Sequence, residues 1–341
     1  MRAALYVGNE SFQLQEREPR EPGPGEVQLD VAYVGICGTD LHIKHGAMDG
    51  RVSVPAVIGH EMSGTVAVVG DGVSAWAPGD QVTVMPLDWC GRCAACRAGH
   101  EHVCENLVFV GIDDAGAMQQ LWTIPERLLV GLPPGIGLKE AALTEPTAVA
   151  VHDVRRGAVG RGERVLVVGG GPIGLLIACV SAAEGAEVLV SEPNPYRRAV
   201  AEELGLRAVD PTTSDLDAAV DAWTAGAGSD VAFEVSGSSA GLRSATHALK
   251  VRGRLVVVAI HSQPVPVDLF RVFWRELELI GARVYERTDF ERAVEMLAAQ
   301  AIPAARLISA IEPLERTMEA FSALESGADV VKVLIDCQER A

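Results

Sequence analysis

Residues 164–174, Arg-Val-Leu-Val-Val-Gly-Gly-Gly-Pro-Ile-Gly, decide the fold of the second half of the chain. Val165–Val168 is a short run of apolar, mostly β-branched residues, which is typical of a buried strand. The glycines that follow match G-x-G-x-x-G and open an apolar segment of helical length, an arrangement that lets backbone approach a pyrophosphate at a helix N-terminus. The stretch therefore predicts a dinucleotide-binding unit. The residues that we assign to it are Gly169, Gly171, Pro172, Ile173 and Gly174.

A carboxylate ends the next predicted strand. Glu192 follows the apolar run Glu187–Ser191 and lies 18 residues after Gly174. Such a carboxylate can accept a hydrogen bond from the adenosine ribose 2′-OH, although a solvated side chain at a strand end is the alternative. Because Glu192 would repel a 2′-phosphate, the sequence predicts NAD rather than NADP. The nearest cations, Arg197 and Arg198, come five and six residues later, and we place Arg197 at the coenzyme.

Strands and helices alternate from about residue 160 onward, which predicts βαβ units and a doubly wound parallel sheet. The predicted strands are Arg164–Gly169, Glu187–Ser191, Val231–Val235 and Arg254–Ile260, and the predicted helices include Pro172–Gly185 and Tyr196–Leu204.

The residues before this region have a different pattern, with many Gly and Pro and short apolar runs, which predicts a β-rich domain. Its clearest strands are Val27–Tyr33, Gly64–Val69 and Gln81–Met85. After Gly281 the pattern is mixed again, with helices at Asp289–Gln300 and Leu314–Ser326 and a strand at Val330–Asp336.

Length and composition fit a globular chain of two domains. The chain has 341 residues, of which 48% are hydrophobic and 22% charged. Its net charge of −17, from 46 acidic and 29 basic residues, disfavours nucleic acid as a partner. No apolar run is long enough to cross a bilayer, and the first residues do not resemble a signal peptide. We therefore predict a cytoplasmic protein without a membrane partner.

Four of the seven cysteines lie within fifteen residues, with the spacing of a zinc site. Four thiolates close a tetrahedral zinc, so a site of this kind is structural. Free or paired cysteines and a nucleic-acid-binding zinc ribbon are the alternatives, and the acidic charge weighs against the ribbon. The four residues are Cys90, Cys93, Cys96 and Cys104.

A second group of possible ligands is scattered along the first half of the chain. Cys37, His60, Glu61 and Glu145 supply a thiolate, an imidazole and carboxylates, which is a mixture that a catalytic zinc with an open position can use. Each residue alone is a weak signal, since a single Cys or His is more often packed than ligating.

These motifs together resemble the zinc-containing medium-chain dehydrogenases of the alcohol, polyol and butanediol group. The resemblance covers nearly the whole chain and rests on Gly35–His42, on Gly59-His60-Glu61-x2-Gly64-x5-Gly70, on the four-cysteine lobe, on Thr144-Glu145-Pro146 and on the glycine loop. It implies a GroES-like catalytic domain in residues 1–146, with the zinc lobe at about 88–106. A Rossmann NAD-binding domain would cover 147–281, and 282–341 would complete the catalytic domain.

The resemblance also implies roles for individual residues. Cys37 and His60 match ligands of a catalytic zinc. Glu61 and Glu145 both match positions that can add a carboxylate ligand, so the choice between them stays open, and water can fill the fourth place. Thr39 matches the hydroxyl that binds the substrate oxygen and takes its proton, and His42 matches the end of that proton relay. The cysteine lobe matches a structural zinc, which gives two zinc ions per chain.

The implied reaction is hydride transfer from a secondary alcohol to NAD, giving a ketone. Glu145, where many simple alcohol dehydrogenases have cysteine, favours a diol, polyol, sugar or cyclitol as substrate. L-Threonine 3-dehydrogenases and simple alcohol dehydrogenases are alternatives, but the former carry a histidine at the position of Leu87. A non-catalytic binding member of the family and a zinc-free quinone reductase are further alternatives.

The resemblance further implies a homodimer or homotetramer. The bulky cluster Phe270, Phe273 and Trp274 is predicted to lie in the core or at a subunit interface.

Overall fold

The computed structural model describes residues 1–327 and 329–339 and divides into two compact units. Unit 1 contains Met1–Glu145, Glu286–Ala298 and the residues from Ile308 onward, and unit 2 contains Pro146–Tyr285 and Ala299–Leu307. The predicted C-terminal segment 282–341 is thus shared between the units, because Ala299–Leu307 packs with unit 2.

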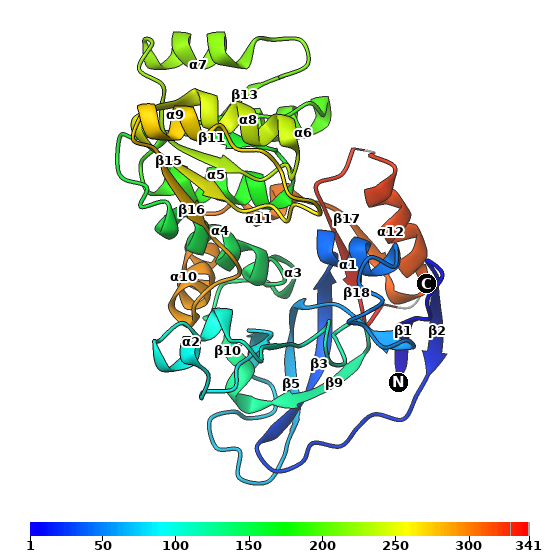
Figure 1. The fold of residues 1–341 in the computed structure, drawn as a ribbon. Helices are drawn as coiled ribbons and strands as arrows, with labels where there is room; N and C mark the ends of the chain where they lie inside the picture. Colours follow the sequence, from blue (N-terminus) through cyan, green and yellow to red (C-terminus); the bar gives the residue numbers. More distant parts are fainter. Residues whose placement is uncertain (328, 340–341) are drawn as a thin grey trace. The chain divides into compact units, whose positions relative to one another are not determined.

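Unit 1 is built around a sheet of order β10-β6-β5-β3-β18-β17, in which β9 also pairs with β3 (Figure 1). Two smaller sheets, β2-β1-β4 and β7-β8, accompany it. The C-terminal residues belong here because β18 pairs antiparallel with β3, with Leu334 opposite Gly35. The strands are β1 (Arg2–Tyr6), β2 (Phe12–Glu16), β3 (Glu26–Gly35), β4 (Ala56–Val57), β5 (Glu61–Val69), β6 (Gln81–Val84), β7 (Leu87–Asp88), β8 (Val108–Phe109), β9 (Leu121–Pro125), β10 (Leu129–Gly131), β17 (Ile308–Pro313) and β18 (Lys332–Asp336).

Helices in unit 1 are short, apart from α10 and α12. They are α1 (Gly38–Lys44), α2 (Ala94–Arg97), α3 (Leu138–Ala141), α10 (Arg287–Ala298) and α12 (Thr317–Glu325), with 3-10 turns η1 (Glu101–Val103), η2 (Glu126–Leu128) and η3 (Leu314–Arg316). Helix α4 (Thr144–Arg156) begins in unit 1 and continues in unit 2.

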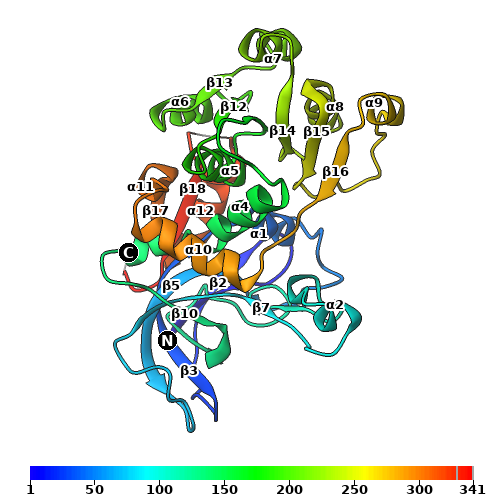
Figure 2. The same ribbon diagram turned by 90° about the vertical axis from the view of Figure 1, so that its left-hand side faces the viewer.

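Unit 2 is a six-stranded, wholly parallel sheet of order β13-β12-β11-β14-β15-β16. This is the order of a doubly wound dinucleotide-binding fold. Successive strands are added on one side of β11 as far as β13 and then on its other side from β14, so the strand order reverses between β11 and β14. Helix α5 packs on β11 and β12, and α8 packs on β11 and β14 (Figure 2). The strands are β11 (Arg164–Val168), β12 (Glu187–Ser191), β13 (Arg207–Val209), β14 (Ser229–Glu234), β15 (Leu249–Val257) and β16 (Glu278–Gly281). The helices are α5 (Pro172–Ala183), α6 (Pro195–Glu203), α7 (Leu216–Thr224), α8 (Ser239–Ala248), α9 (Leu269–Trp274) and α11 (Ala304–Leu307).

The core of unit 2 follows from its parallel topology. Helices cover a parallel sheet, so its central strands are apolar throughout rather than alternating. Val165, Leu166 and Val167 on β11 and Val231, Ala232 and Phe233 on β14 are all fully buried.

In the part of the chain that the structure describes, no helix combines the length and the apolar character needed to cross a membrane.

Candidate active site

Helix α1 begins at the predicted zinc ligand Cys37. The Cys37 backbone N–H donates to Oδ2 of Asp40 at 2.9 Å, while the Cys37 side chain faces the backbone N–H of Asp40, so the two residues form a capping box. This cap fixes the thiol between the end of β3 and the first turn of α1. Asp40 is fully buried, and burial raises the pKa of its carboxyl group.

The turn before β5 places His60 beside this cap. Gly59 adopts φ +100°, and a Cβ there would lie 2.9 Å from Cγ1 of Val34, so the turn requires glycine. The buried His60 ring has Nδ1 3.6 Å from Oδ1 of Asp40, and it meets the ring of Phe109 edge-on at 5.1 Å between centroids. The structure thus brings together Cys37 and His60, which are 23 positions apart in the sequence.

Glu61 completes a cluster of three possible ligands. Ligand atoms of Cys37, His60 and Glu61 all lie within 4.8 Å of one another. Glu61 is buried and forms an ion pair with Lys332 on β18, whose Nζ also donates to the carbonyl oxygen of Ile36 at 2.9 Å. Burial lowers the pKa of Lys332, but the negative charges of Glu61 and Cys37 outweigh burial and raise it.

The electrostatics of this cluster favour a cation. Burial lowers the pKa of His60, but Asp40 and Cys37 outweigh burial and raise it to about 10. Oδ1 of Asp40 and Nδ1 of His60 are buried and make no hydrogen bond. A thiolate, an imidazole and a carboxylate at this separation fit a zinc ion with an open position.

The remaining predicted residues of this site lie close by in unit 1. Glu145, the second residue of α4, is buried, and its negative charge contributes to raising the pKa of both His60 and Lys332. Thr39 is half-buried in the first turn of α1, and His42, three residues later, is exposed. Along α1, polar side chains therefore lie between the ligand cluster and solvent. The roles of Thr39 and His42 in proton transfer stay predictions.

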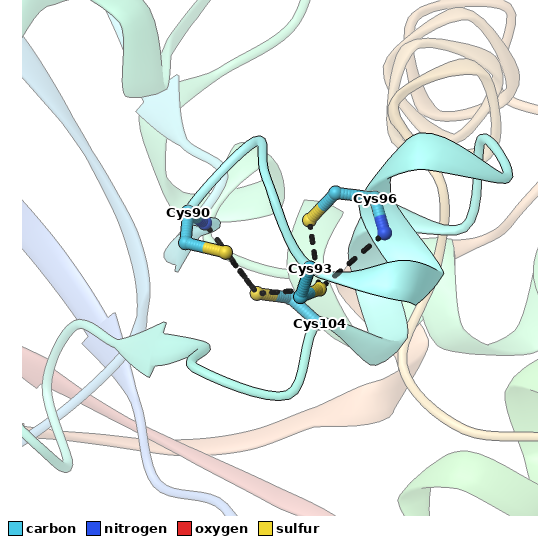
Figure 3. Close-up of side chains that lie close together, drawn as sticks. All are labelled: Cys90, Cys93, Cys96 and Cys104. Carbon is cyan, nitrogen blue, oxygen red and sulfur yellow. Dashed lines mark hydrogen bonds between the residues drawn. The ribbon is translucent and has the colours of Figure 1, made fainter.

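The four cysteines of the second predicted site converge around α2 (Figure 3). Their sulfur atoms are separated by 3.4 Å for Cys93 and Cys96, 3.8 Å for Cys93 and Cys104, and 3.5 Å for Cys104 and Cys90. Tetrahedral zinc–sulfur bonds of about 2.3 Å place sulfurs about 3.8 Å apart, so the cluster fits one zinc ion. Backbone N–H groups of Arg92 and Cys93 lower the pKa of Cys90 to about 6, which favours the thiolate that a metal requires.

The glycine loop of unit 2 has the geometry that a pyrophosphate needs. Gly171 is the N-cap of α5 and Pro172 its first residue, so the first turn points free N–H groups into the loop. A Cβ on Gly174 would collide with the carbonyl oxygen of Gly169, which explains why the helix can begin so close to the strand. Nε of Arg197 is buried without a hydrogen-bond partner, and a Cβ on Gly171 would lie 4.0 Å from its guanidinium group.

Glu192 is held rigidly at the end of β12. It is 4% exposed, and its carboxylate accepts hydrogen bonds from the backbone of Gly170 at 2.6 Å and of Asn194 at 2.8 Å. Arg198, in contrast, is engaged elsewhere: it donates to the carbonyl oxygens of Glu192 and Pro193 and pairs with Asp210 at 3.1 Å. Arg198 is therefore not available to receive a 2′-phosphate.

Sequence reasoning missed Lys332. It is one of four lysines in the chain and stands inside the apolar run Val330–Ile335, where a charged residue implies a buried partner. That signal could have marked Lys332, but only pairing of β18 with β3 shows that the partner is Glu61.

Two family models match parts of the chain. The family described as "Alcohol dehydrogenase GroES-like domain" matches residues 23–134, and the family "Zinc-binding dehydrogenase" matches residues 172–299.

Two curated relatives match over most of their length. The chain is 52% identical to a 2-dehydro-3-deoxy-L-galactonate 5-dehydrogenase from Pseudoalteromonas atlantica, over 99% of both chains. It is 31% identical to an L-galactonate-5-dehydrogenase from Escherichia coli, over 90% of both chains.

Two solved structures are similar as well. The 2R,3R-butanediol dehydrogenase from Bacillus subtilis gives a TM-score of 0.90 at 30% identity, covering 98% of this chain and 99% of that one. A zinc-binding dehydrogenase from Sinorhizobium meliloti bound to NADP gives 0.91 at 30% identity, covering 98% of both chains.

Proposed function

This chain belongs to the zinc-dependent alcohol and polyol dehydrogenases, and we propose that within this family it oxidises a secondary hydroxyl group of a sugar acid. Membership confirms the predicted GroES-like and Rossmann folds. The chain is an NAD-dependent, zinc-containing dehydrogenase that converts a secondary alcohol to a ketone.

One observation carries the substrate proposal. The relative that is 52% identical over 99% of both chains acts, by its name, at carbon 5 of a deoxy sugar acid. The 31% identical relative acts at carbon 5 of another sugar acid. Both carbons are secondary and carry a hydroxyl group beside further oxygen substituents, as the sequence predicts for a polyol-like substrate.

The residues of unit 1 would bind the two zinc ions. Cys37 and His60 would hold the catalytic zinc together with Glu61 or Glu145, and Cys90, Cys93, Cys96 and Cys104 would hold the structural ion. When bound, zinc supplies a Lewis acid that lowers the pKa of the substrate hydroxyl, and NAD supplies the hydride acceptor.

Proton transfer falls to α1. The Thr39 hydroxyl would accept the substrate proton as it releases its own proton along a relay that ends at the exposed His42, which gives a proton to solvent. Lys332 keeps the Glu61 carboxylate in place by its ion pair, so Glu61 is oriented before substrate binds.

A substrate panel tests the proposal. We expect the highest kcat/KM with 2-dehydro-3-deoxy-L-galactonate or L-galactonate, lower values with sorbitol and 2,3-butanediol, and poor turnover of ethanol. If L-threonine or ethanol were the best substrate, the sugar-acid assignment would have to be abandoned. If no alcohol were oxidised by zinc-loaded protein, the non-catalytic alternative would hold instead.

Self-association through α9 is part of the same proposal. Leu269, Phe270, Phe273 and Trp274 are between 69% and 76% exposed, so Phe270, Phe273 and Trp274 do not lie in the core, and the subunit-interface alternative remains. Phe270 stacks on Trp274 at 5.8 Å, and β16 beside this helix is an edge strand. Light scattering should give a dimer or tetramer, and Phe273→Asp should shift it toward the monomer; a monomeric parent would refute this interface.

A cytoplasmic location is part of the same proposal. None of the seven cysteines forms a disulfide, which suits a compartment that keeps thiols reduced. Fractionation of cells should recover the protein with cytoplasmic markers.

A further inference from the structure

A buried carboxylate–imidazole pair lies at the carboxyl edge of the parallel sheet in unit 2. Glu234 is the last residue of β14 and is fully buried. Its Oε2 contacts Nε2 of His261 at 2.9 Å, and His261 follows the end of β15 by four residues. Neither Glu234 nor His261 belongs to the zinc sites, the proton relay or the glycine loop.

The hydrogen bonds of Glu234 fix the tautomer of His261. Oε1 of Glu234 accepts from the backbone N–H groups of Ser236 at 2.9 Å and Gly237 at 3.0 Å and from the Ser236 hydroxyl. A carboxylate bound in this way accepts from His261, so the Nε2 atom of the neutral ring carries the proton and Nδ1 is an acceptor.

Nδ1 of His261 has no partner of its own. It is buried and makes no hydrogen bond, while the side chain as a whole is 12% exposed. A buried acceptor without a donor is unfavourable, so this nitrogen is suited to receive a hydrogen bond from a bound molecule.

The pair lies where a dinucleotide crosses the sheet. Strand order reverses between β11 and β14, and open parallel sheets bind ligands outside the carboxyl ends of the strands at such a reversal. The backbone N–H of Val235 donates to the carbonyl oxygen of Val168 at 2.9 Å, and a Cβ on Gly169 would lie 3.0 Å from the backbone nitrogen of Ser236. The loop that carries Glu234 is therefore packed against the glycine loop.

The assignment of Glu192 to the adenosine ribose decides which half of the coenzyme lies near Glu234 and His261. Glu192 directly follows β12, on one side of β11, where it would face the adenosine ribose. The other nucleoside then extends over the ends of β14 and β15, on the opposite side of β11. Its carboxamide N–H and ribose O–H groups are donors, as Nδ1 requires.

We propose that His261, oriented by Glu234, is a binding residue for the nicotinamide nucleoside of NAD and accepts a hydrogen bond from it through Nδ1. The proposal rests on the assignment of unit 2 as the coenzyme domain.

Binding of NADH, ADP-ribose and ADP to the zinc-loaded protein tests the pair. His261→Gln keeps a polar atom to meet Glu234 and removes the acceptor at Nδ1. We expect its NADH affinity to fall about three- to tenfold, in line with one hydrogen bond, with ADP affinity unchanged. A parallel loss for ADP-ribose would identify the ribose hydroxyl, and an unchanged ADP-ribose affinity would identify the carboxamide; both support the proposal.

Controls separate this inference from the coenzyme assignment. His247, at the end of α8, lies 3.8 Å from Asp268 near the opposite edge of the sheet, so His247→Gln should leave NADH affinity unchanged. His261→Asn, which keeps a polar atom near the position of Nδ1, should lose less affinity than His261→Gln. Unchanged NADH affinity in His261→Gln, equal losses for NADH and ADP, or an equal loss in His261→Asn would overturn the proposal. Failure of the parent to bind ADP would overturn the coenzyme site itself.

Discussion

Coenzyme selectivity is the property that the structure predicts most sharply. The carboxylate of Glu192 is fixed by two backbone N–H groups, and the nearest alternative cation, Arg198, is held by Asp210 and two carbonyl groups. A 2′-phosphate would thus meet a fixed negative charge, while Arg198 is engaged and the other nearby cation, Arg197, lies beside Gly171 in the glycine loop. One solved relative holds NADP, so the fold alone does not decide this choice.

The magnitude follows from Coulomb's law. Two unit charges about 5 Å apart in a medium of effective dielectric constant about 20 repel by roughly 3 kcal/mol. Solvent at the rim of the site reduces this value, and we expect NAD to be preferred over NADP by at least about tenfold in kcat/KM, or about 1.4 kcal/mol.

Two substitutions test the charge of Glu192 and the engagement of Arg198. Glu192→Gln removes the charge and should bring the two coenzymes to within about threefold of each other in kcat/KM, less than 1 kcal/mol. Adding Asp210→Asn releases Arg198 and should lower the KM for NADP further. Both coenzymes are compared at saturating substrate, together with NADH and NADPH binding.

Glu187→Gln is the matched control, because it removes a carboxylate from the opposite end of the same strand. A parent enzyme that used NADP as well as NAD would refute the role of Glu192. Equal effects of Glu192→Gln and Glu187→Gln on the ratio would refute it as well.

Three further predictions concern unit 1. Elemental analysis should find two zinc ions per chain; Cys93→Ser should lose one ion and destabilise the fold, whereas Cys37→Ser should remain folded but inactive, and identical behaviour of both variants would contradict the division of roles. Thr39→Val should lower kcat by about 10²- to 10⁴-fold with both zinc ions retained, and a value within about threefold of the parent would exclude Thr39 from proton transfer. Lys332→Met should lower the free energy of unfolding, measured in urea, by about 3–5 kcal/mol because it leaves Glu61 buried without its cation. Adding Glu61→Gln to this variant should recover part of the loss, and no recovery would argue against the ion pair.

Local sequence determined the elements whose signals are contained in a few neighbouring residues. The run Arg164–Gly174 contains a strand, a glycine loop and a Pro at the first helical position, and the structure has β11 and α5 there. Cysteine spacing likewise pointed to a four-thiolate cluster, since Cys90, Cys93 and Cys96 follow one another at intervals of three positions and cannot separate far. The strand order of unit 2 is one of the few arrangements that right-handed parallel crossovers allow.

Tertiary structure decided the relations between distant residues. No spacing rule links Glu61 to Lys332, which lie 271 positions apart and meet only because β18 joins the sheet beside β3. The exposure of Phe270, Phe273 and Trp274 was equally open, because a short apolar helix has the same sequence in a core and on a surface. His261 became a candidate only through its contact with Glu234, since a lone histidine carries no signal of its partner. Periodicity and spacing record what the backbone does locally, whereas burial and charge pairing depend on which strands become neighbours.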